Sequence, residues 1–245
     1  IVVRLDPLGE QVYARRFAGT THEFATDVAI GPNGETVVVG SFRDTLDFGL
    51  GPLVSAGDFD DFVIHLDSLG NVLQSAAFGG PGREGNPSVA VDSAGNVALT
   101  GSYSDGASFG GPKLTTPALN GLVASYDPGG GLRWAIPFTG ANADVQGDDI
   151  FRLAVDSQDN VVLAGQFAGS LAMGDTLLQA EGDMQLLVAR IRADGEILGV
   201  CGYGSVNAEI TGDVAVDPVS REVLLTGSYW GELDLGLGPM NNDSN

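Results

Sequence analysis

Short apolar runs alternate with turn residues along the whole chain. Four segments share one order of apolar run, turn and second apolar run: DVAIGPNGETVVVGSF from Asp27, SVAVDSAGNVALTGSY from Ser88, RLAVDSQDNVVLAGQF from Arg152 and DVAVDPVSREVLLTGSY from Asp213. Their shared alanine recurs at intervals of 61, 64 and 61 residues, at Ala29, Ala90, Ala154 and Ala215. This spacing predicts four repeats of about 61 residues, a period typical of propellers and solenoids.

A second motif recurs in the same phase. It reads IVVRLDPLGEQVYARRFAG from Ile1, FVIHLDSLGNVLQSAAFGG from Phe62, LVASYDPGGGLRWAIPFTG from Leu122 and LVARIRADGEILGVCGYG from Leu187. Both motifs place Asp-x-x-Gly or a close variant between two apolar runs. Asp side chains accept hydrogen bonds from nearby backbone amides, and Gly supplies the positive φ of a tight turn. Each motif therefore predicts a hairpin, and each repeat has at least four strands.

Between the two hairpins of each repeat lies a linker, TLDFGLGPLVSAG in the first repeat, with counterparts ASFGGPKLTTPA, LAMGDTLLQAEG and ELDLGLGPM. We expect a short extra ribbon there. The Phe or Leu before Gly is expected to fill the gap between neighbouring repeats. No segment shows sustained helical periodicity or a helix-cap pattern.

The predicted fold is all-β: a β-propeller of four blades, each four-stranded and about 61 residues long, with a linear β-solenoid as the alternative. We treat 1–245 as one domain, with 1–26 as the outer hairpin of the closing blade and repeats over 27–86, 87–150, 151–211 and 212–245. Joining the ends gives GPMNNDSN-IVVRLDPLGE, which reads as a shortened SAGDFDDFVIHLDSLGN. The N-terminal hairpin is therefore expected to close the ring by pairing with the last repeat. The alternative is a four-repeat piece of a longer array.

Charge narrows the choice of partners. The 245 residues contain 11 basic and 32 acidic side chains, for a formal net charge of −21. Such a surface repels nucleic acid and anionic lipid, and no apolar run has the length of a membrane span. The acidic surface is interpreted as solvated. Ca²⁺ binding, cationic partners and a salty medium are the alternatives.

The repeat as a whole resembles a known family. The pattern G-G…V-A-V-D-x-x-G-N-V-x-x-T-G-x-[FY], followed by F-V-x-x-L-D-x-x-G, is similar to the bacterial β-propeller repeat of secreted and cell-surface proteins, often called the seven-bladed β-propeller repeat. The resemblance implies export and an extracellular or cell-surface location. Only four repeats are present, Arg192 replaces a turn Asp, and Gly31 replaces another. Because the chain starts at Ile1, we expect a processed or excised piece whose signal peptide lies outside it.

The candidate ligand-binding residues lie in the connections that lead into each repeat, TTHEFATD, PGREGNPS, ANADVQGDD and SVNAEITGD. In a propeller such connections gather on one face, where ligands bind. Unselected loop drift gives the same variation. The residues are His22, Glu23, Asp27, Arg83, Glu84, Asp144, Asp148, Asp149, Glu209 and Asp213.

No cofactor or metal site is expected. The turn aspartates occur once per hairpin, without the alternating ligands of a calcium loop, so Ca²⁺ has no motif to support it. The cluster Asp58, Asp60 and Asp61 is interpreted as hydration and strand-edge protection. Cys201, the only cysteine, is expected to be a small buried hydrophobe.

The function expected from these patterns is a non-catalytic binding or scaffold module of an exported bacterial protein. It would bind a protein or a glycan, but the residues do not identify the ligand. No Ser-His-Asp order or phosphate loop indicates an enzyme. A structural spacer is one alternative. The other is a lyase or hydrolase with acidic channel residues, which convergent, buried carboxylates with shifted pKa values would favour.

Overall fold

The chain is all-β in the computed structural model, which describes residues 1–103, 106–115, 120–140, 151–182, 184–204, 209–235 and 238–241. Strands account for 60% of the structure, and the described residues form no helix. The prediction of an all-β chain is confirmed.

Three antiparallel four-stranded units follow one another, and each consists of the two predicted hairpins. The first sheet has the order β3 (Glu23–Ile30), β4 (Thr36–Phe42), β7 (Asp60–Leu66) and β8 (Val72–Phe78). The second has β9 (Gly85–Val91), β10 (Val97–Tyr103), β11 (Asn120–Tyr126) and β12 (Leu132–Gly140). The third has β13 (Arg152–Val155), β14 (Val161–Phe167), β17 (Gln185–Ile191) and β18 (Ile197–Tyr203).

Two further hairpins flank these sheets. The N-terminal hairpin joins β1 (Val2–Leu5) to β2 (Gln11–Arg15), and the C-terminal hairpin joins β19 (Glu209–Val216) to β20 (Val223–Tyr229). By the repeat, β1–β2 is equivalent to β7–β8, and β19–β20 is equivalent to β3–β4. Each flanking hairpin is thus one half of a four-stranded unit.

The predicted ribbons form in three repeats. They are β5 (Thr45–Asp47) with β6 (Pro52–Val54), β15 (Ser170–Met173) with β16 (Thr176–Gln179), and β21 (Glu232–Asp234) with β22 (Pro239–Asn241). The β15–β16 ribbon also pairs with β12, which extends the second sheet to six strands. Of the residues that precede the linker glycines, Phe48 and Phe109 are buried as predicted and so is Met173, but Leu235 in the last linker is exposed, so the prediction was wrong there. The ring of Phe109 stacks on Phe78 of the preceding sheet, with centroids 5.7 Å apart.

The turn chemistry follows the sequence prediction. In five turns the Asp Oδ1 accepts the N–H groups of the residues two and four positions later, at 2.8–2.9 Å; these are Asp6, Asp67, Asp92, Asp127 and Asp156. The residue three positions after this Asp has a positive φ; it is glycine in four of the turns, as at Gly95 (82°), and Asp159 (63°) in the fifth. Where Arg192 replaces Asp, the carboxylate of Asp194 accepts the N–H of Glu196 and the turn still forms.

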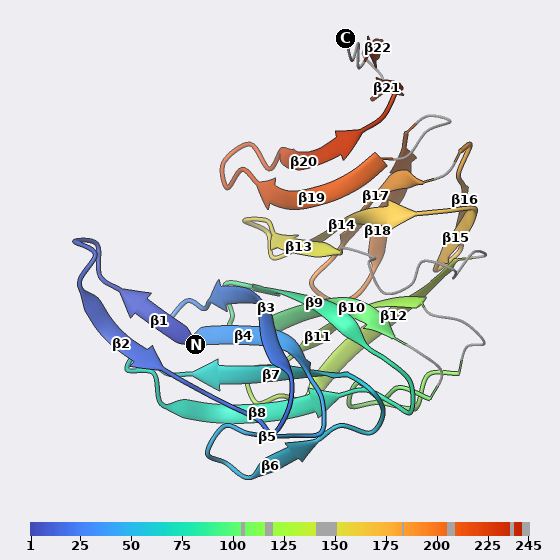
Figure 1. Cartoon of the computed structure of the whole chain (residues 1–245). Coiled ribbons are helices and arrows are strands. Elements are labelled where there is room, and N and C mark those ends of the chain that lie inside the picture. Colours follow the sequence, from blue (N-terminus) through green and yellow to red (C-terminus); the bar gives the residue numbers. More distant parts are fainter. Residues whose placement is uncertain are drawn as a thin grey trace.

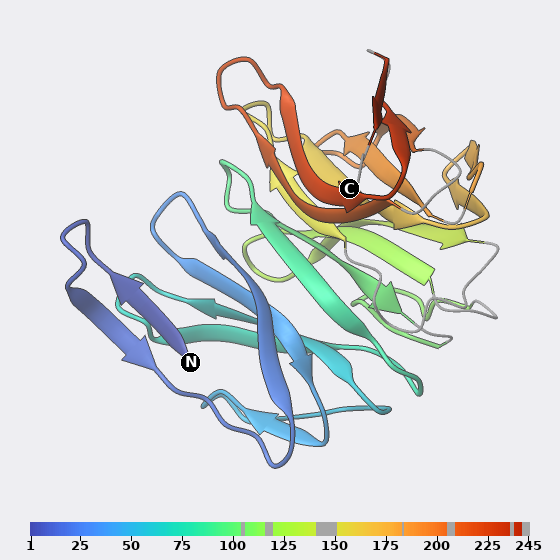
Figure 2. The ribbon, with the colours of Figure 1, turned by 45° about the horizontal axis from the view of Figure 1, so that its top comes forward.

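The sheets stack face to face along an arc, and β3, β9, β13 and β19 of successive repeats contact one another (Figure 1). Figure 2 shows the Asp turns along one face of the arc and the ribbons on the opposite face. Apolar clusters join neighbouring sheets. One unites Val37 and Val39 with Val89, Leu99 and Phe109.

The expected ring closure within one chain is not formed. Among the described residues, β1 and β2 pair only with each other, and so do β19 and β20. The two hairpins lie apart in both views, with the open side of the arc between them (Figures 1 and 2). The successive sheets curve too little over this length to bring the two halves together.

Candidate functional site: the cleft between the first and second sheets

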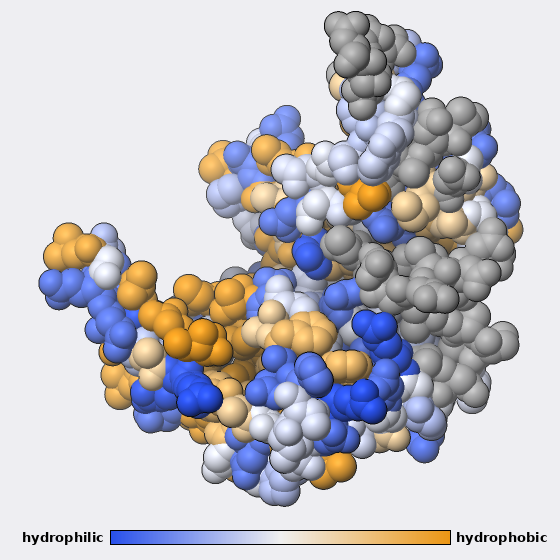
Figure 3. All heavy atoms as spheres, viewed as in Figure 1, coloured by the Kyte–Doolittle hydropathy of each residue, from blue (hydrophilic) through white to orange (hydrophobic). Residues whose placement is uncertain are grey.

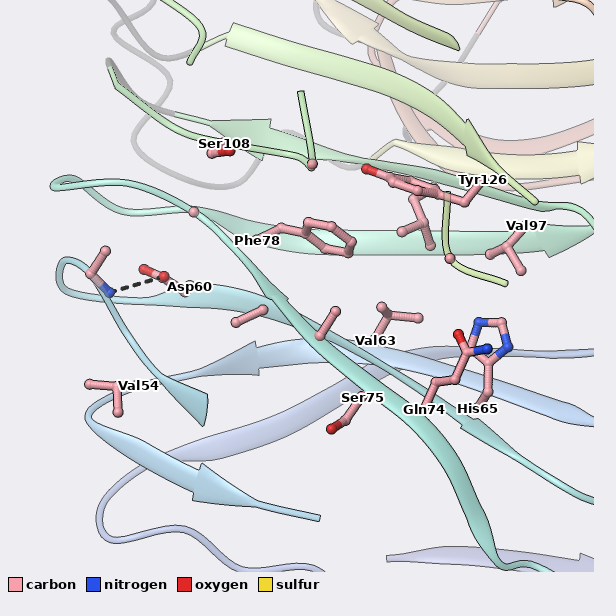
Figure 4. A pocket seen from close by; sticks show the side chains of 17 residues that line it. Val54, Asp60, Val63, His65, Gln74, Ser75, Phe78, Val97, Ser108 and Tyr126 are labelled. Atoms are coloured by element: carbon pink, nitrogen blue, oxygen red, sulfur yellow. Dashed lines mark hydrogen bonds between the residues drawn. The ribbon is translucent and has the colours of Figure 1, made fainter. Parts of the chain in front are cut away.

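A cavity of about 530 Å³ opens between β7–β8 of the first sheet and β10–β11 of the second (Figure 4). Most of its wall is apolar, from Val54, Val63, Phe78, Val97, Leu99 and Tyr126. Polar groups are few, and those labelled in Figure 4 are Asp60, His65, Gln74, Ser75 and Ser108. This size and this mixture of many apolar groups with few polar ones are typical of small-molecule and side-chain binding sites.

The cleft exists because one position on β8 lacks the aromatic side chain that two of its three repeat counterparts carry; the third counterpart is Gly199. Gln74 is equivalent to Tyr13 in the N-terminal hairpin and to Trp134 in the second sheet. Trp134 fills the gap toward the third sheet, and its Nε1 donates to Ala193 O at 3.0 Å. Gln74 Nε2 donates to the equivalent carbonyl, that of Pro128, at 3.1 Å, but the side chain leaves the space of an indole empty.

A second position adds to the same space. Ala76 stands where Ile136 packs against the cluster between the second and third sheets. Both differences lie on β8 and face the second sheet. At the next junction, between the second and third sheets, Trp134 and Ile136 fill the equivalent space.

Asp60, at the start of β7, is the charged group at one end of the cleft. It is buried, its Oδ2 accepts the Ala56 N–H at 3.0 Å, and its Oδ1 has no hydrogen-bond partner among the described residues. Burial, with a smaller contribution from the nearby Glu84 carboxylate, raises the pKa of Asp60 to about 6. A buried polar atom without a partner costs free energy, and a ligand with a donor group relieves that cost.

Asp61 and Glu84 lie close to Asp60 but belong to the framework. Ser41 Oγ donates to Asp61 Oδ1 at 2.9 Å, and the Gly80 N–H donates to Glu84 Oε2 at 2.9 Å. Both side chains are buried, and burial raises the pKa of Asp61 well above its usual range. Asp60 is among the residues that line the cleft, whereas Asp61, on the same face of β7 as Val63 and His65, is enclosed between Ser41 and Gly101 of the second sheet. The interpretation of Asp60 and Asp61 as hydrated strand-edge residues was wrong.

The far end of the cleft is polar but uncharged. Burial lowers the pKa of His65, so its imidazole is neutral at physiological pH. His65 and Gln74 lie together at one end of the cleft and Asp60 at the other (Figure 4). The two titratable side chains therefore do not act on the same atom of a ligand.

The residues expected from the loops are found in different surroundings. His22 and Arg83 are exposed, Glu23 is half-buried, and Glu84 is buried beside Asp60. Arg83 lies over the Phe59 ring, 5.7 Å from its centroid. Asp144, Asp148 and Asp149 lie outside the described residues. Glu209 is the first residue of β19.

Two of the expected residues lie within inner strands rather than loops. Asp27 Oδ2 accepts the Ser88 hydroxyl at 2.6 Å and the Val89 N–H at 3.0 Å, which ties β3 to β9. Asp213 is exposed on β19. The expected set therefore shares only Glu84 with the surroundings of the cleft. His65, Gln74 and Ser75 were missed, although the loss of an aromatic residue at position 74 was visible in the repeats.

Other chemistry is sparse in the described part of the chain. There, no group of three or more His, Cys, Asp or Glu side chains is placed to hold a metal ion. Cys201 is exposed on β18, so the prediction of a buried cysteine was wrong. The described residues include no helix that is long and apolar enough to cross a membrane.

Comparison with known proteins adds no assignment. No family model matches the chain. A search of curated protein sequences finds no significant match.

Proposed function

We propose that the chain is a non-catalytic binding module built on β-propeller blades, and that it takes its ligand in the cleft between the first two sheets. The observation that carries the proposal is this cavity of about 530 Å³, with Asp60 Oδ1 unpartnered at its end. The three repeated four-stranded units, flanked by two half units, support the assignment as blades.

The lining selects a ligand with an apolar body and a basic end. Val63, Phe78 and Leu99 offer no hydrogen bonds, so hydroxyl-rich sugars gain little there. The Asp60 carboxylate, ionised above its pKa of about 6, attracts an ammonium or guanidinium group. A Lys or Arg side chain of a protein partner has this chemistry, as does an alkylamine. Of the two partner classes expected from the sequence, a protein fits better than a glycan.

Catalysis has less support. An acid–base pair needs two titratable groups within reach of one substrate atom. Among the described residues that line the cleft, Asp60 and His65 lie at opposite ends, and Asp61, enclosed with Ser41, is not part of the lining. A secreted or cell-surface setting for this binding module rests on the repeat resemblance alone.

The test uses three six-carbon probes of equal length: hexylamine, hexanol and hexanoate. Saturation-transfer NMR at pH 7.5 should show binding in the order hexylamine, hexanol, hexanoate, since only the first places a cation at Asp60. Gln74→Trp, which puts an indole where Trp134 has one, should abolish binding. Leu73→Trp is the matched control, because Leu73 is exposed on the same strand and does not line the cleft. Equal probe binding by the wild type and Gln74→Trp would refute the proposal.

A further inference from the structure

The C-terminal hairpin presents an apolar face that every equivalent strand buries. The strands β10 (VALTGSY) and β20 (VLLTGSY) differ at one residue, yet β10 is buried throughout and β20 is almost entirely exposed. Leu224 is 57% exposed, whereas the equivalent residues Val37, Ala98 and Val162 are 2%, 3% and 0% exposed. A sequence typical of a central strand lies here at an edge.

The first sheet carries the complementary face. Val28 on β3 is 56% exposed, whereas its equivalents Val89, Leu153 and Val214 are 4%, 7% and 7% exposed. Each of these three buried residues shares an apolar cluster with the Leu224 equivalent of the preceding repeat. The pairs are Val37 with Val89, Ala98 with Leu153, and Val162 with Val214. The pair that would continue the series is Leu224 with Val28.

An open groove marks where the missing strands belong. A cavity of about 390 Å³ lies between the N-terminal hairpin and the first sheet, lined by Val2, Phe17, Phe24, Val38 and Phe62, among others. Figure 3 shows apolar surface in the notch between this hairpin and the body of the molecule. In the complete units, a strand equivalent to β20 pairs with the strand equivalent to β1, as β4 does with β7 and β10 with β11.

The charged residues also indicate that a β19–β20 hairpin belongs in this groove. Arg190 on β17 donates to the carboxylate of Asp156 at 2.7 Å; Asp156 lies in the first turn of the same sheet. Arg190 also donates to the backbone carbonyl of Arg221 in the next repeat. Arg4 is its equivalent on β1, and it donates to the carbonyl of Gly34, which is equivalent to that of Arg221. The counterpart of Asp156 for Arg4 is Asp217, in the turn of the β19–β20 hairpin.

We propose that β19–β20 of one chain enters this groove on a second copy and completes a four-stranded sheet, β19-β20-β1-β2. The register follows from the internal sheets: Leu225 faces Val3 as Leu99 faces Ala124, and Val223 faces Leu5 as Val97 faces Tyr126. A two-fold dimer makes this junction twice, so both end faces of both chains are buried. The new interface continues the packing that already joins successive sheets.

A second copy fits better than the same chain. The arc holds its two end hairpins apart, so closure within one chain would require every junction between sheets to tighten (Figure 2). Pairing between two copies leaves the three existing junctions unchanged. The inference is independent of ligand binding in the cleft.

The first experiment measures mass in solution by light scattering. The expected value is twice the chain mass of 25.1 kDa. Leu224→Glu and Val28→Glu should each raise the dimer dissociation constant by about tenfold or more, because each places a charge in the new core. Leu224 and Val28 are both exposed in the single chain, so neither substitution should affect the folding of that chain. Leu177→Glu is the control, since Leu177 is equally exposed but lies on the β15–β16 ribbon. A monomer at all concentrations, or a dimer indifferent to both variants, would overturn the proposal.

The second experiment separates two copies from one. Cys201→Ser removes the only native thiol, and Val3→Cys and Leu225→Cys are then placed on different chains and mixed under oxidising conditions. Pairing between copies yields a covalent heterodimer, because directly opposed residues bring their Cβ atoms within disulfide reach. Leu224→Cys mixed with Val3→Cys is the control, since Leu224 faces the other side of β20. Absence of a heterodimer from the in-register pair would overturn the proposal.

Discussion

Two adjacent aspartates show how one strand serves both the framework and the site. Asp61 holds Ser41 inside the fold, and Asp60 faces the cleft with one oxygen unpartnered. Sequence reasoning treats Asp as a surface residue, because a buried carboxylate is costly unless it is paired or protonated. The exception here comes from the Glu84 loop that folds over the start of β7, a contact between residues that no local pattern reveals.

This burial predicts an unusual pH dependence of stability. The pKa values of Asp60 and Asp61 are raised in the folded state, so the fold binds protons more tightly than the unfolded chain. The free energy of unfolding should therefore be higher at pH 5 than at pH 7.5, and fall as the pH rises through about 6. Urea unfolding at both pH values measures it. Asp61→Asn keeps an acceptor for Ser41 and should reduce the difference in unfolding free energy between pH 5 and pH 7.5. If the double variant Asp60→Asn/Asp61→Asn kept the full difference, the account would be contradicted.

Ligand binding should have the opposite pH dependence. Alkylamines stay protonated over this range, since their pKa is close to the value of about 10.4 for Lys. Hexylamine affinity should rise as Asp60 ionises through a pH of about 6 and then level off. Asp60→Asn should remove both the rise and the preference for hexylamine over hexanol. NMR titrations from pH 5 to 8 test this, and a pH-dependent affinity that survives in Asp60→Asn would exclude Asp60 as the cation contact.

At the scale of the element, hairpins and turns were predictable because their causes are local. About fifteen consecutive residues contain the two strands and the turn of each motif, and the structure forms them as predicted. The linkers were likewise predicted to form ribbons with a buried Phe or Leu before Gly; this holds for Phe48 and Phe109 and fails for Leu235, which is exposed. The cleft was not predicted: the difference at Gln74 is visible in the repeats, but only the folded chain shows that its counterpart Trp134 fills the junction to the next sheet.

The turn aspartates should contribute unequally to stability. Asp92 is buried, its Oδ1 accepts two backbone N–H groups, and its Oδ2 accepts the Asn96 side chain. Asp92→Ala should lower the free energy of unfolding by about 1–3 kcal/mol, because buried donors lose their acceptor. Asp6→Ala, in the exposed turn of the N-terminal hairpin, should cost less, since water replaces the carboxylate there. Chemical unfolding of both variants checks the order, and an equal or larger loss in Asp6→Ala would contradict it.

At the scale of the whole molecule, the sequence repeats predicted the four-stranded sheets, but the predicted closure of these sheets into a ring did not form. The register of the chain ends suited pairing within one chain, yet the curvature of the stack is set by side-chain packing at each junction. The structure leaves β1–β2 and β19–β20 apart, with apolar faces that match the internal junctions. The two-copy arrangement follows from that match rather than from the ends of the sequence.

Charge reversal across the new junction gives an independent prediction. Arg4→Asp and Asp217→Arg should each weaken dimerisation, and the double variant should recover part of the loss, because the pair is restored with its signs exchanged. Sedimentation at several concentrations measures the three dissociation constants. Losses that simply add in the double variant would show that Arg4 and Asp217 do not meet.

The measurement that tests the binding cleft most directly is thermal unfolding of the wild type and Gln74→Trp, each with and without hexylamine. Without the probe, Gln74→Trp should unfold at a higher temperature, because the indole fills the cavity of about 530 Å³ and reaches the Pro128 carbonyl; cavity filling of this kind contributes about 0.5–2 kcal/mol. Hexylamine should raise the unfolding temperature of the wild type only, since a ligand stabilises the state that binds it. A Gln74→Trp variant that is less stable than the wild type, or that keeps the full hexylamine shift, would contradict the account.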